Sequence, residues 1–222
     1  KRLYFSNITD EDSKILIELL DYYSERILSD EMYFYDYNLT SNNLATYYSF
    51  TNNFQKSIEL YERNIDLIKK AKTWSNSGDQ ILFLYDRLLS ISNLFSPENI
   101  LSYLSPVLEI IKERNLESTE RATSVYNSFG QGFFKLGNLE DSYFYLYKAL
   151  NNEENNENKS YIYPLILSNL IQNFIGENKL DKIDPLIEKL TSYKSLNYVE
   201  GSVGITDYYL TLSKVYFMQG EF

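Results

Sequence analysis

The chain has 222 residues, of which 44% are hydrophobic and only 8 are glycine and 4 proline, a composition that can bury a continuous core and excludes a disordered chain. Its formal net charge is −10, so it lacks the attraction for phosphate that dominates nucleic-acid binding, and we expect no nucleic-acid partner. Cysteine is absent, which excludes disulfides, thiolate nucleophiles and cysteine-containing metal sites.

Apolar runs in this sequence are only a few residues long, whereas a membrane-spanning helix needs roughly 20. No signal peptide is visible either. We therefore expect a soluble cytoplasmic protein that does not contact a membrane. The sequence begins without Met and stops inside a repeating pattern, and we interpret it as a fragment of a longer protein.

Apolar residues recur down the chain at a spacing of about 42 residues, which is a strong repeat signal. The first column is Leu44, Arg87, Phe129, Leu170 and Leu212. Four positions later stand Tyr48, Ile91, Phe133, Phe174 and Tyr216. Eight positions after the first column stand Asn52, Phe95, Gly137, Asn178 and Gly220, and ten positions after it stand Phe54, Pro97, Leu139, Leu180 and Phe222.

Each repeat contains two segments whose apolar residues follow helical spacing, separated by a short polar turn, which predicts a pair of helices. In chain order we predict an opening second-type helix over 10–28, then first helices near 32–51, 78–94, 118–136, 161–176 and 203–218. Second helices follow near 54–71, 97–114, 139–151 and 180–194. The whole chain is then one helical repeat domain, with units near 1–29, 30–72, 73–115, 116–158, 159–200 and 201–222.

Local residues refine the helix ends. The first helix is expected to open at Thr9–Asp10, and Ser96 can cap the helix that starts with Pro97. Pro106 and Pro185 fall inside second helices, where a missing amide donor should kink or loosen the helix. Six residues should be largely buried between the helix layers: Tyr48, Phe133, Leu139, Leu146, Phe174 and Leu180.

Residues suited to catalysis are scarce. The chain has no His, no glycine-rich phosphate loop, and acidic residues that mostly fall on solvent faces of the predicted helices. The acidic run Asn151–Asn158 is interpreted as a solvated loop rather than a metal site, because its spacing matches no calcium loop. The whole chain has 22 Tyr residues, and we interpret them as filling the spaces between packed helices rather than as a stacking surface for bases or sugars. We expect no enzymatic activity and no cofactor.

The repeats resemble the tetratricopeptide repeat, and the closest copy is the stretch Phe129–Ser142 (FGQGFFKLGNLEDS) continuing through Leu146 and Leu150. The resemblance covers about residues 10–222. It implies an all-α fold of antiparallel helix pairs stacked into a right-handed superhelical solenoid, with a concave groove lined by first helices. The long period is similar to that of kinesin light chains and bacterial peptide-pheromone receptors.

Small residues that the family uses for close helix approach occur only in alternate units. Ala45, Gly130 and Ser213 alternate with Leu88 and Ile171, and Ser57 and Ser142 alternate with Ile100 and Ile183. The bulky residues should increase the separation of the helices in alternate units.

The resemblance also implies a set of groove residues, carried over position by position from the exposed face of the first helices. The candidates are Asn42, Thr46, Tyr85, Asn127, Gln131, Phe134, Ser168, Gln172, Ile175 and Lys214. Asn and Gln present both a donor and an acceptor, so they can pair with an extended peptide backbone. The alternative is that these are ordinary polar surface positions. Lys135 and Lys214 are the only basic residues on this face, which disfavours a cationic clamp for a peptide carboxylate.

Two functions remain. The first is protein or peptide binding by the sensing region of a bacterial signalling protein or transcriptional regulator. The second is a structural scaffold that joins larger proteins. A helix-turn-helix or kinase domain elsewhere in the same protein would favour the first.

The two ends of the sequence carry apolar helix faces without a partner. Ile15, Leu19 and Tyr22 lie on the opening helix, and Leu212 and Tyr216 lie on the closing one. Because neighbouring repeats cover each other's apolar faces, we expect these surfaces to form a homodimer through the ends or to fray in solution.

Overall fold

The structure is a computed structural model that describes residues 8–27, 32–70, 78–197, 210–211 and 213–217. Within these ranges the chain is all-α and contains no β-strand, as the sequence predicts. The chain divides into two compact units, Lys1–Arg114 and Asn115–Phe222. This division falls next to the boundary at 115/116 expected between two repeats.

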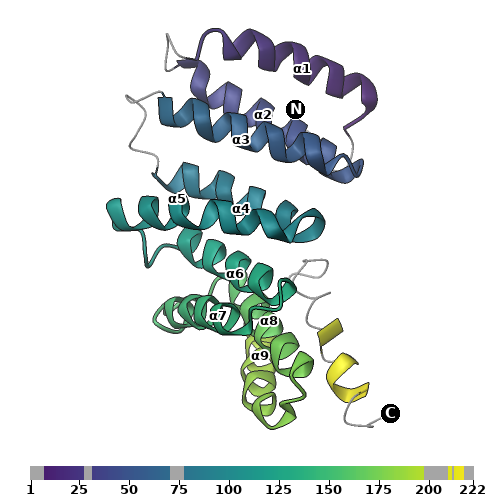
Figure 1. Ribbon diagram of the computed structural model, residues 1–222, viewed down its shortest axis with the longest axis vertical. Helices are drawn as coiled ribbons and strands as arrows, with labels where there is room; N and C mark the ends of the chain where they lie inside the picture. Colours follow the sequence, from purple (N-terminus) through teal and green to yellow (C-terminus); the bar gives the residue numbers. More distant parts are fainter. Residues whose placement is uncertain (1–7, 28–31, 71–77, 198–209, 212, 218–222) are drawn as a thin grey trace. The chain divides into compact units, whose positions relative to one another are not determined.

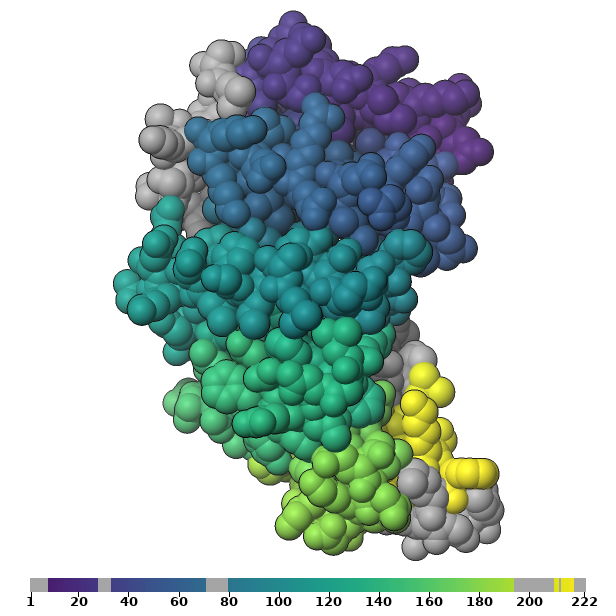
Figure 2. Space-filling view, in the orientation of Figure 1, coloured from purple at the N-terminus to yellow at the C-terminus, as the bar shows by residue number. Residues whose placement is uncertain are grey.

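The first unit is a succession of packed helices (Figure 1). Its helices are α1 (Asp10–Ser24), α2 (Met32–Phe50), α3 (Phe54–Lys70), α4 (Gly78–Phe95) and α5 (Ile100–Glu113), with the short 3-10 turn η3 (Pro97–Asn99) before α5. Each of the five helices packs on the next one along the chain. Figure 2 shows the same residues in space-filling form, coloured along the sequence.

The second unit contains α6 (Glu120–Lys135), α7 (Leu139–Glu154), α8 (Ile162–Gly176), the 3-10 turn η4 (Leu180–Lys182) and α9 (Asp184–Asn197). Helix α6 packs on both α7 and α8, and α8 also packs on α7 and α9. A further helical stretch lies within 210–217. Most of the predicted helix 203–218, and the column residues Leu212, Gly220 and Phe222, lie outside the described residues.

Small residues bring α2 and α3 together, and likewise α6 and α7. The Ser57 hydroxyl donates to the Ala45 carbonyl at 2.8 Å, and the Ser142 hydroxyl donates to the Gly130 carbonyl at 2.7 Å. In both pairs the serine follows its partner by 12 residues. The small-residue column therefore allows a helix-to-helix hydrogen bond that its bulky counterparts cannot make.

The Asn/Gly column closes the first helices of three repeats with a left-handed residue. Asn52, Gly137 and Asn178 have φ of 58°, 75° and 57°. The next amide bonds back to the carbonyl five residues earlier in each case: to Tyr48 at 2.7 Å, Phe133 at 2.9 Å and Phe174 at 2.8 Å. This is the hydrogen-bond pattern of a Schellman helix end. Where the column holds Phe95, α4 continues through that residue instead.

Replacing Asn178 with valine should destabilise the protein by about 1–2 kcal/mol, because a β-branched residue is strained at positive φ. Replacing it with glycine should be nearly neutral, since glycine adopts this conformation freely. Urea unfolding of both variants checks this. Equal loss of stability in the two variants would mean that the side chain of Asn178, rather than its backbone conformation, is what matters.

Several predicted helix ends need correction. Thr9 does form a capping box with Asp12, but the Ser96 side chain makes no capping hydrogen bond, and only Pro97 acts as expected in the first turn. Pro185 is not inside a helix that runs from 180. The 3-10 turn η4 ends first and α9 restarts at Asp184, which places Pro185 in a first turn, where no amide donor is required.

The predicted core positions are confirmed in part. Phe133, Leu146 and Phe174 are buried, whereas Tyr48, Leu139 and Leu180 are half-buried at the helix ends. None of the six is exposed, but the column residues Phe95 and Tyr216 are. None of the helices in the described ranges is long and apolar enough to span a bilayer.

Candidate peptide-binding face on the first helices

Helices α6 and α8 lie side by side and run in the same direction. The Asn169 Nδ2 donates to the Asn127 Oδ1 at 2.9 Å, across 42 residues of sequence. A Cβ on Gly176 would lie only 3.2 Å from Cε2 of Phe134, so this second contact has the same sequence offset as the first. Two contacts at one offset mean that the helices are parallel and in register with the repeat period.

The surface between these two contacts is made of amide side chains with an apolar end. Its six half-buried residues, called the α6–α8 face below, are Asn127, Gln131 and Phe134 on α6 and Asn169, Gln172 and Ile175 on α8. Gln131 and Gln172 lie along their helices between the two contacts. The face therefore combines hydrogen-bonding groups with an apolar patch next to them.

The Asn127–Asn169 pair keeps hydrogen-bonding capacity for a ligand. The single bond between them uses the Oδ1 of Asn127 and the Nδ2 of Asn169. The Nδ2 of Asn127 and the Oδ1 of Asn169 bond to no other residue in the described part of the chain. One donor and one acceptor held next to each other match the N–H and C=O groups of a peptide backbone.

None of the six residues of this face is charged. Lys135 follows Phe134 at the end of α6. Burial lowers the pKa of the Lys135 ammonium. The centre of the face is neutral, which suits a backbone better than a charged side chain.

A buried hydrogen-bond chain fixes α8 against α6 through α7. The Asn173 Nδ2 donates to the Ser142 Oγ at 2.7 Å, and that hydroxyl donates to the Gly130 carbonyl at 2.7 Å. Asn173 and Ser142 are 1% and 0% exposed. Asn173, Ser142 and Gly130 belong to three different helices, so these two hydrogen bonds hold the α6–α8 face in one geometry.

A second set of contacts joins the start of α7 to the end of α8. The Tyr143 ring packs 5.1 Å from the Phe174 ring, and its hydroxyl donates to the Glu177 carboxylate. That hydrogen bond, followed by the one from Lys179, lowers the pKa of Glu177, while burial and the Glu177 carboxylate raise the pKa of Tyr143.

Five of the candidate groove residues thus come together: Asn127, Gln131, Phe134, Gln172 and Ile175. Ser168 does not join them. It is 2% exposed, so the expectation that it lies on the exposed groove is wrong. On α8 the half-buried residues of this side are Leu165, Asn169, Gln172 and Ile175, so two of the three carried-over positions hold and Asn169 stands where Ser168 was expected.

The candidates in the first unit do not share one exposed face. Asn42 points at α3, where its Oδ1 accepts from the Tyr61 hydroxyl at 3.1 Å, and the Thr46 hydroxyl bonds to the Asn42 carbonyl at 2.7 Å. Tyr85 is 4% exposed and its hydroxyl accepts from the Lys69 ammonium at 2.9 Å. The expectation that Tyr85 is an exposed groove residue is therefore wrong, because α4 packs on both α3 and α5.

Lys214 is exposed in the last described helical stretch. Asn169 was missed by the transfer of family positions. Its signal was available in the sequence, because Leu165, Asn169 and Gln172 follow helical spacing.

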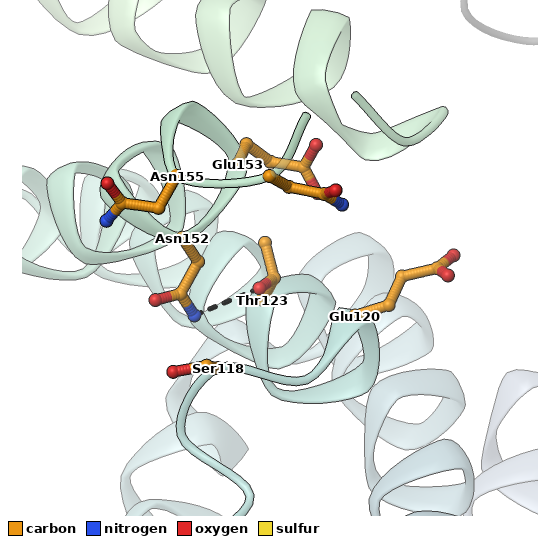
Figure 3. Close-up of a pocket in the computed structure, with 7 residues that line it drawn as sticks. Ser118, Glu120, Thr123, Asn152, Glu153 and Asn155 are labelled. Atoms are coloured by element: carbon orange, nitrogen blue, oxygen red, sulfur yellow. Dashed lines mark hydrogen bonds between the residues drawn. The ribbon is translucent and has the colours of Figure 1, made fainter. Parts of the chain in front are cut away.

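A polar cleft of about 390 Å³ lies at the ends of α6 and α7 (Figure 3). It is lined by Ser118, Glu120, Thr123, Asn152, Glu153, Asn155 and Asn156. Figure 3 shows the Asn152 amide directed at the Thr123 hydroxyl, at 3.0 Å. Among the described residues there is no group of three or more carboxylate, His or Cys side chains arranged to hold a metal ion.

The polar groups of this cleft hold the turn after α7 together. The Glu153 carboxylate, 2% exposed, accepts from the Ser160 amide at 2.8 Å and the Ser160 hydroxyl at 2.6 Å. The Lys159 ammonium donates to the carbonyls of Glu153 at 2.8 Å and Asn156 at 2.6 Å. The run Asn151–Asn158 is therefore not all loop, because α7 continues to Glu154 and the turn beyond it is hydrogen-bonded.

Comparison with known proteins places the fold. No protein-family model matches the sequence, and no curated protein matches it. The structure resembles the crystal structure of BtubC (BKLC) from P. vanneervenii, with a TM-score of 0.79 over 96% of this chain and 85% of that chain. The chain has an all-α, helical-repeat-like fold similar to that of BtubC. At 16% sequence identity, the likeness to BtubC concerns the fold alone.

Proposed function

We propose that this chain is a non-catalytic tetratricopeptide-type domain that binds an extended peptide or protein segment across the α6–α8 face. The observation that carries the proposal is the Asn127–Asn169 pair, which presents a spare donor and a spare acceptor at one end of a neutral face. The family resemblance adds that the helix pairs stack in a right-handed superhelix with first helices on the concave side. On this proposal the chain is the sensing region of a bacterial signalling protein or transcriptional regulator.

An extended backbone fits this face for two reasons. The amide groups of Gln131 and Gln172 continue the hydrogen-bonding surface beyond the Asn pair, so the peptide needs no particular side chain there. Phe134 and Ile175 then offer an apolar patch for one side chain of the ligand. Selectivity would come from that patch.

A scaffold role is the second candidate, and a different surface supports it. On the outer side of α7, Phe144 and Tyr147 are 59% and 42% exposed. Exposed aromatic residues one helical turn apart form a usable contact for a partner protein. Binding there would leave the α6–α8 face unused.

Replacing Asn127 and Gln131 together with alanine should weaken peptide binding without unfolding the protein. Each backbone hydrogen bond lost costs about 0.5–1.5 kcal/mol, which is roughly 2- to 13-fold in Kd for each residue. The measurement selects binders from a random-sequence peptide library with the wild-type protein and then titrates the selected peptide into each variant.

The matched control is Asn151→Ala, which removes an exposed amide from α7 outside the face. This control should bind like the wild type. If the double variant also binds like the wild type, while Phe144→Ala abolishes binding, the scaffold role is the better assignment.

A further inference from the structure

Four polar side chains are enclosed where α2 meets α3. Tyr37, Ser41 and Asn64 are 0% exposed and Asn38 is 8% exposed. The hydroxyls of Tyr37 and Ser41, and both amide atoms of Asn38 and of Asn64, have no hydrogen-bond partner among the described residues. Buried polar groups in proteins are nearly always hydrogen-bonded, so this concentration in one place requires a cause.

The register of the two helices places Asn38 opposite Asn64. Ala45 and Ser57 meet through a hydrogen bond, and one turn along, the Tyr61 hydroxyl reaches Asn42. Asn38 lies seven residues before Ala45 on α2, and Asn64 lies seven residues after Ser57 on α3. Seven residues are about two helical turns, so both asparagines lie on the faces that the helices turn toward each other.

The positions of Asn38 and Asn64, on the facing surfaces of the two helices (the seam), hold other residues in the other repeats. The corresponding pairs are Ile81 with Val107, Thr123 with Ala149, and Pro164 with Leu190. All six are buried, and the one hydroxyl among them, on Thr123, is hydrogen-bonded to the Thr119 carbonyl at 3.0 Å. Only the α2–α3 pair carries two asparagines in this column, so repeat packing by itself does not require them.

We propose that the α2–α3 seam is a hydration site, in which buried water molecules bridge the amides of Asn38 and Asn64 and the hydroxyls of Tyr37 and Ser41. The four groups are neutral and offer both donors and acceptors, which is what water satisfies and what an ion does not. A buried water typically makes about three hydrogen bonds to otherwise unpaired groups. The four side chains provide enough partners for more than one such molecule.

Neighbouring residues make a direct protein partner less suitable. Tyr61 and Ala45, the next residues along the seam, already use their polar groups with Asn42 and Ser57. The Tyr37 hydroxyl is enclosed, and burial raises its pKa to about 12, so it stays protonated and can donate to water. These observations favour water as the partner of the four groups.

A high-resolution crystal structure of the wild-type protein, together with NMR detection of water contacts to the side-chain NH₂ groups of Asn38 and Asn64, tests the proposal. The expected result is ordered water within hydrogen-bond distance of both amides in the crystal and long-lived water contacts to both in solution. The two amides bonded directly to each other, with no water at either, would overturn it.

A second test compares a double variant with a single variant, and the double variant copies a residue pair found in another repeat of this chain. Asn38→Ile with Asn64→Val copies the Ile81–Val107 pair of the same column, and it should expel the water and remain folded. Asn64→Val alone leaves the Asn38 amide buried with fewer partners, so it should melt at a lower temperature than the double variant. A single variant as stable as the double variant would contradict a shared hydration site, and if the double variant fails to fold, the wild-type crystal and NMR measurements still decide.

Discussion

Gly130→Leu should strongly destabilise the second unit. Even a Cβ at this position would lie 2.5 Å from Leu146 Cγ and 3.1 Å from the Ser142 carbonyl oxygen. Leu146 is fully buried, and the Ser142 carbonyl belongs to helical backbone. Overpacking by added methylenes typically costs about 1–3 kcal/mol, and leucine adds several atoms, so we expect a loss above about 3 kcal/mol.

Gly130→Ala should be milder, because the clash of one methyl group is offset in part by the roughly 1 kcal/mol that alanine gains over glycine inside a helix. Urea unfolding measured by circular dichroism gives both values. The matched control is Gly137→Asn. A Cβ at Gly137 meets nothing within 4 Å, and Asn occupies the same left-handed position at 52 and 178, so the change should stay within about 0.5 kcal/mol. A stable Gly130→Leu variant would show that α6 and α7 are not in close contact.

Phe129→Ala should cost about 3–5 kcal/mol, the range found for removing a buried phenylalanine. Phe129 is 0% exposed and its ring lies 5.4 Å from that of Tyr145. The rings of Phe133 and Tyr126 lie 5.6 Å and 6.2 Å from the same tyrosine. Removing Phe129 therefore leaves a cavity in the centre of an aromatic cluster between α6 and α7.

Phe144→Ala is the control for this prediction. Phe144 also lies near Tyr145, at 5.0 Å between ring centroids, but it is 59% exposed. Its removal leaves no enclosed cavity, so the loss should not exceed the roughly 0.5–1.5 kcal/mol of an aromatic pair. Thermal unfolding of the two variants separates them. Equal losses would mean that contact with Tyr145, and not burial, determines the effect.

The fold was predictable because the repeat column fixes both helices of each unit. Asn52, Gly137 and Asn178 mark helix ends where a left-handed residue is required, and these ends are found there. Serine at Ser57 and Ser142 marked the close helix pairs, and both hydroxyls bond to the facing helix. Such local requirements can be seen in one sequence because each depends on one residue type at one position.

The accessible face was harder to predict, because it depends on how far each helix is rotated about its axis. On α8, Gln172 and Ile175 lie on the expected side, whereas Ser168 is buried and the next residue, Asn169, is half-buried on the face in its place. Tyr85 is buried for a related reason, since α4 is covered by two neighbours. The residue pattern gives the period of a helix, and the packing of larger residues in the neighbouring helices sets its rotation.

Buried polar residues were the least predictable feature. Asn38 and Asn64 occupy positions that are apolar or hydrogen-bonded in the other repeats. Their amides are as polar as those of surface asparagines, so composition alone does not distinguish them. Only the register of α2 against α3 identifies the pair as buried.

Side-chain amide resonances test the proposed binding face most directly. A peptide selected from the random library should be titrated into the ¹⁵N-labelled protein while the NH₂ signals of Asn and Gln are followed. Binding across the α6–α8 face predicts shifts for Asn127, Gln131, Asn169 and Gln172, with Asn151 unchanged. A peptide that binds while these four signals stay in place, and shifts others instead, would contradict the proposed face.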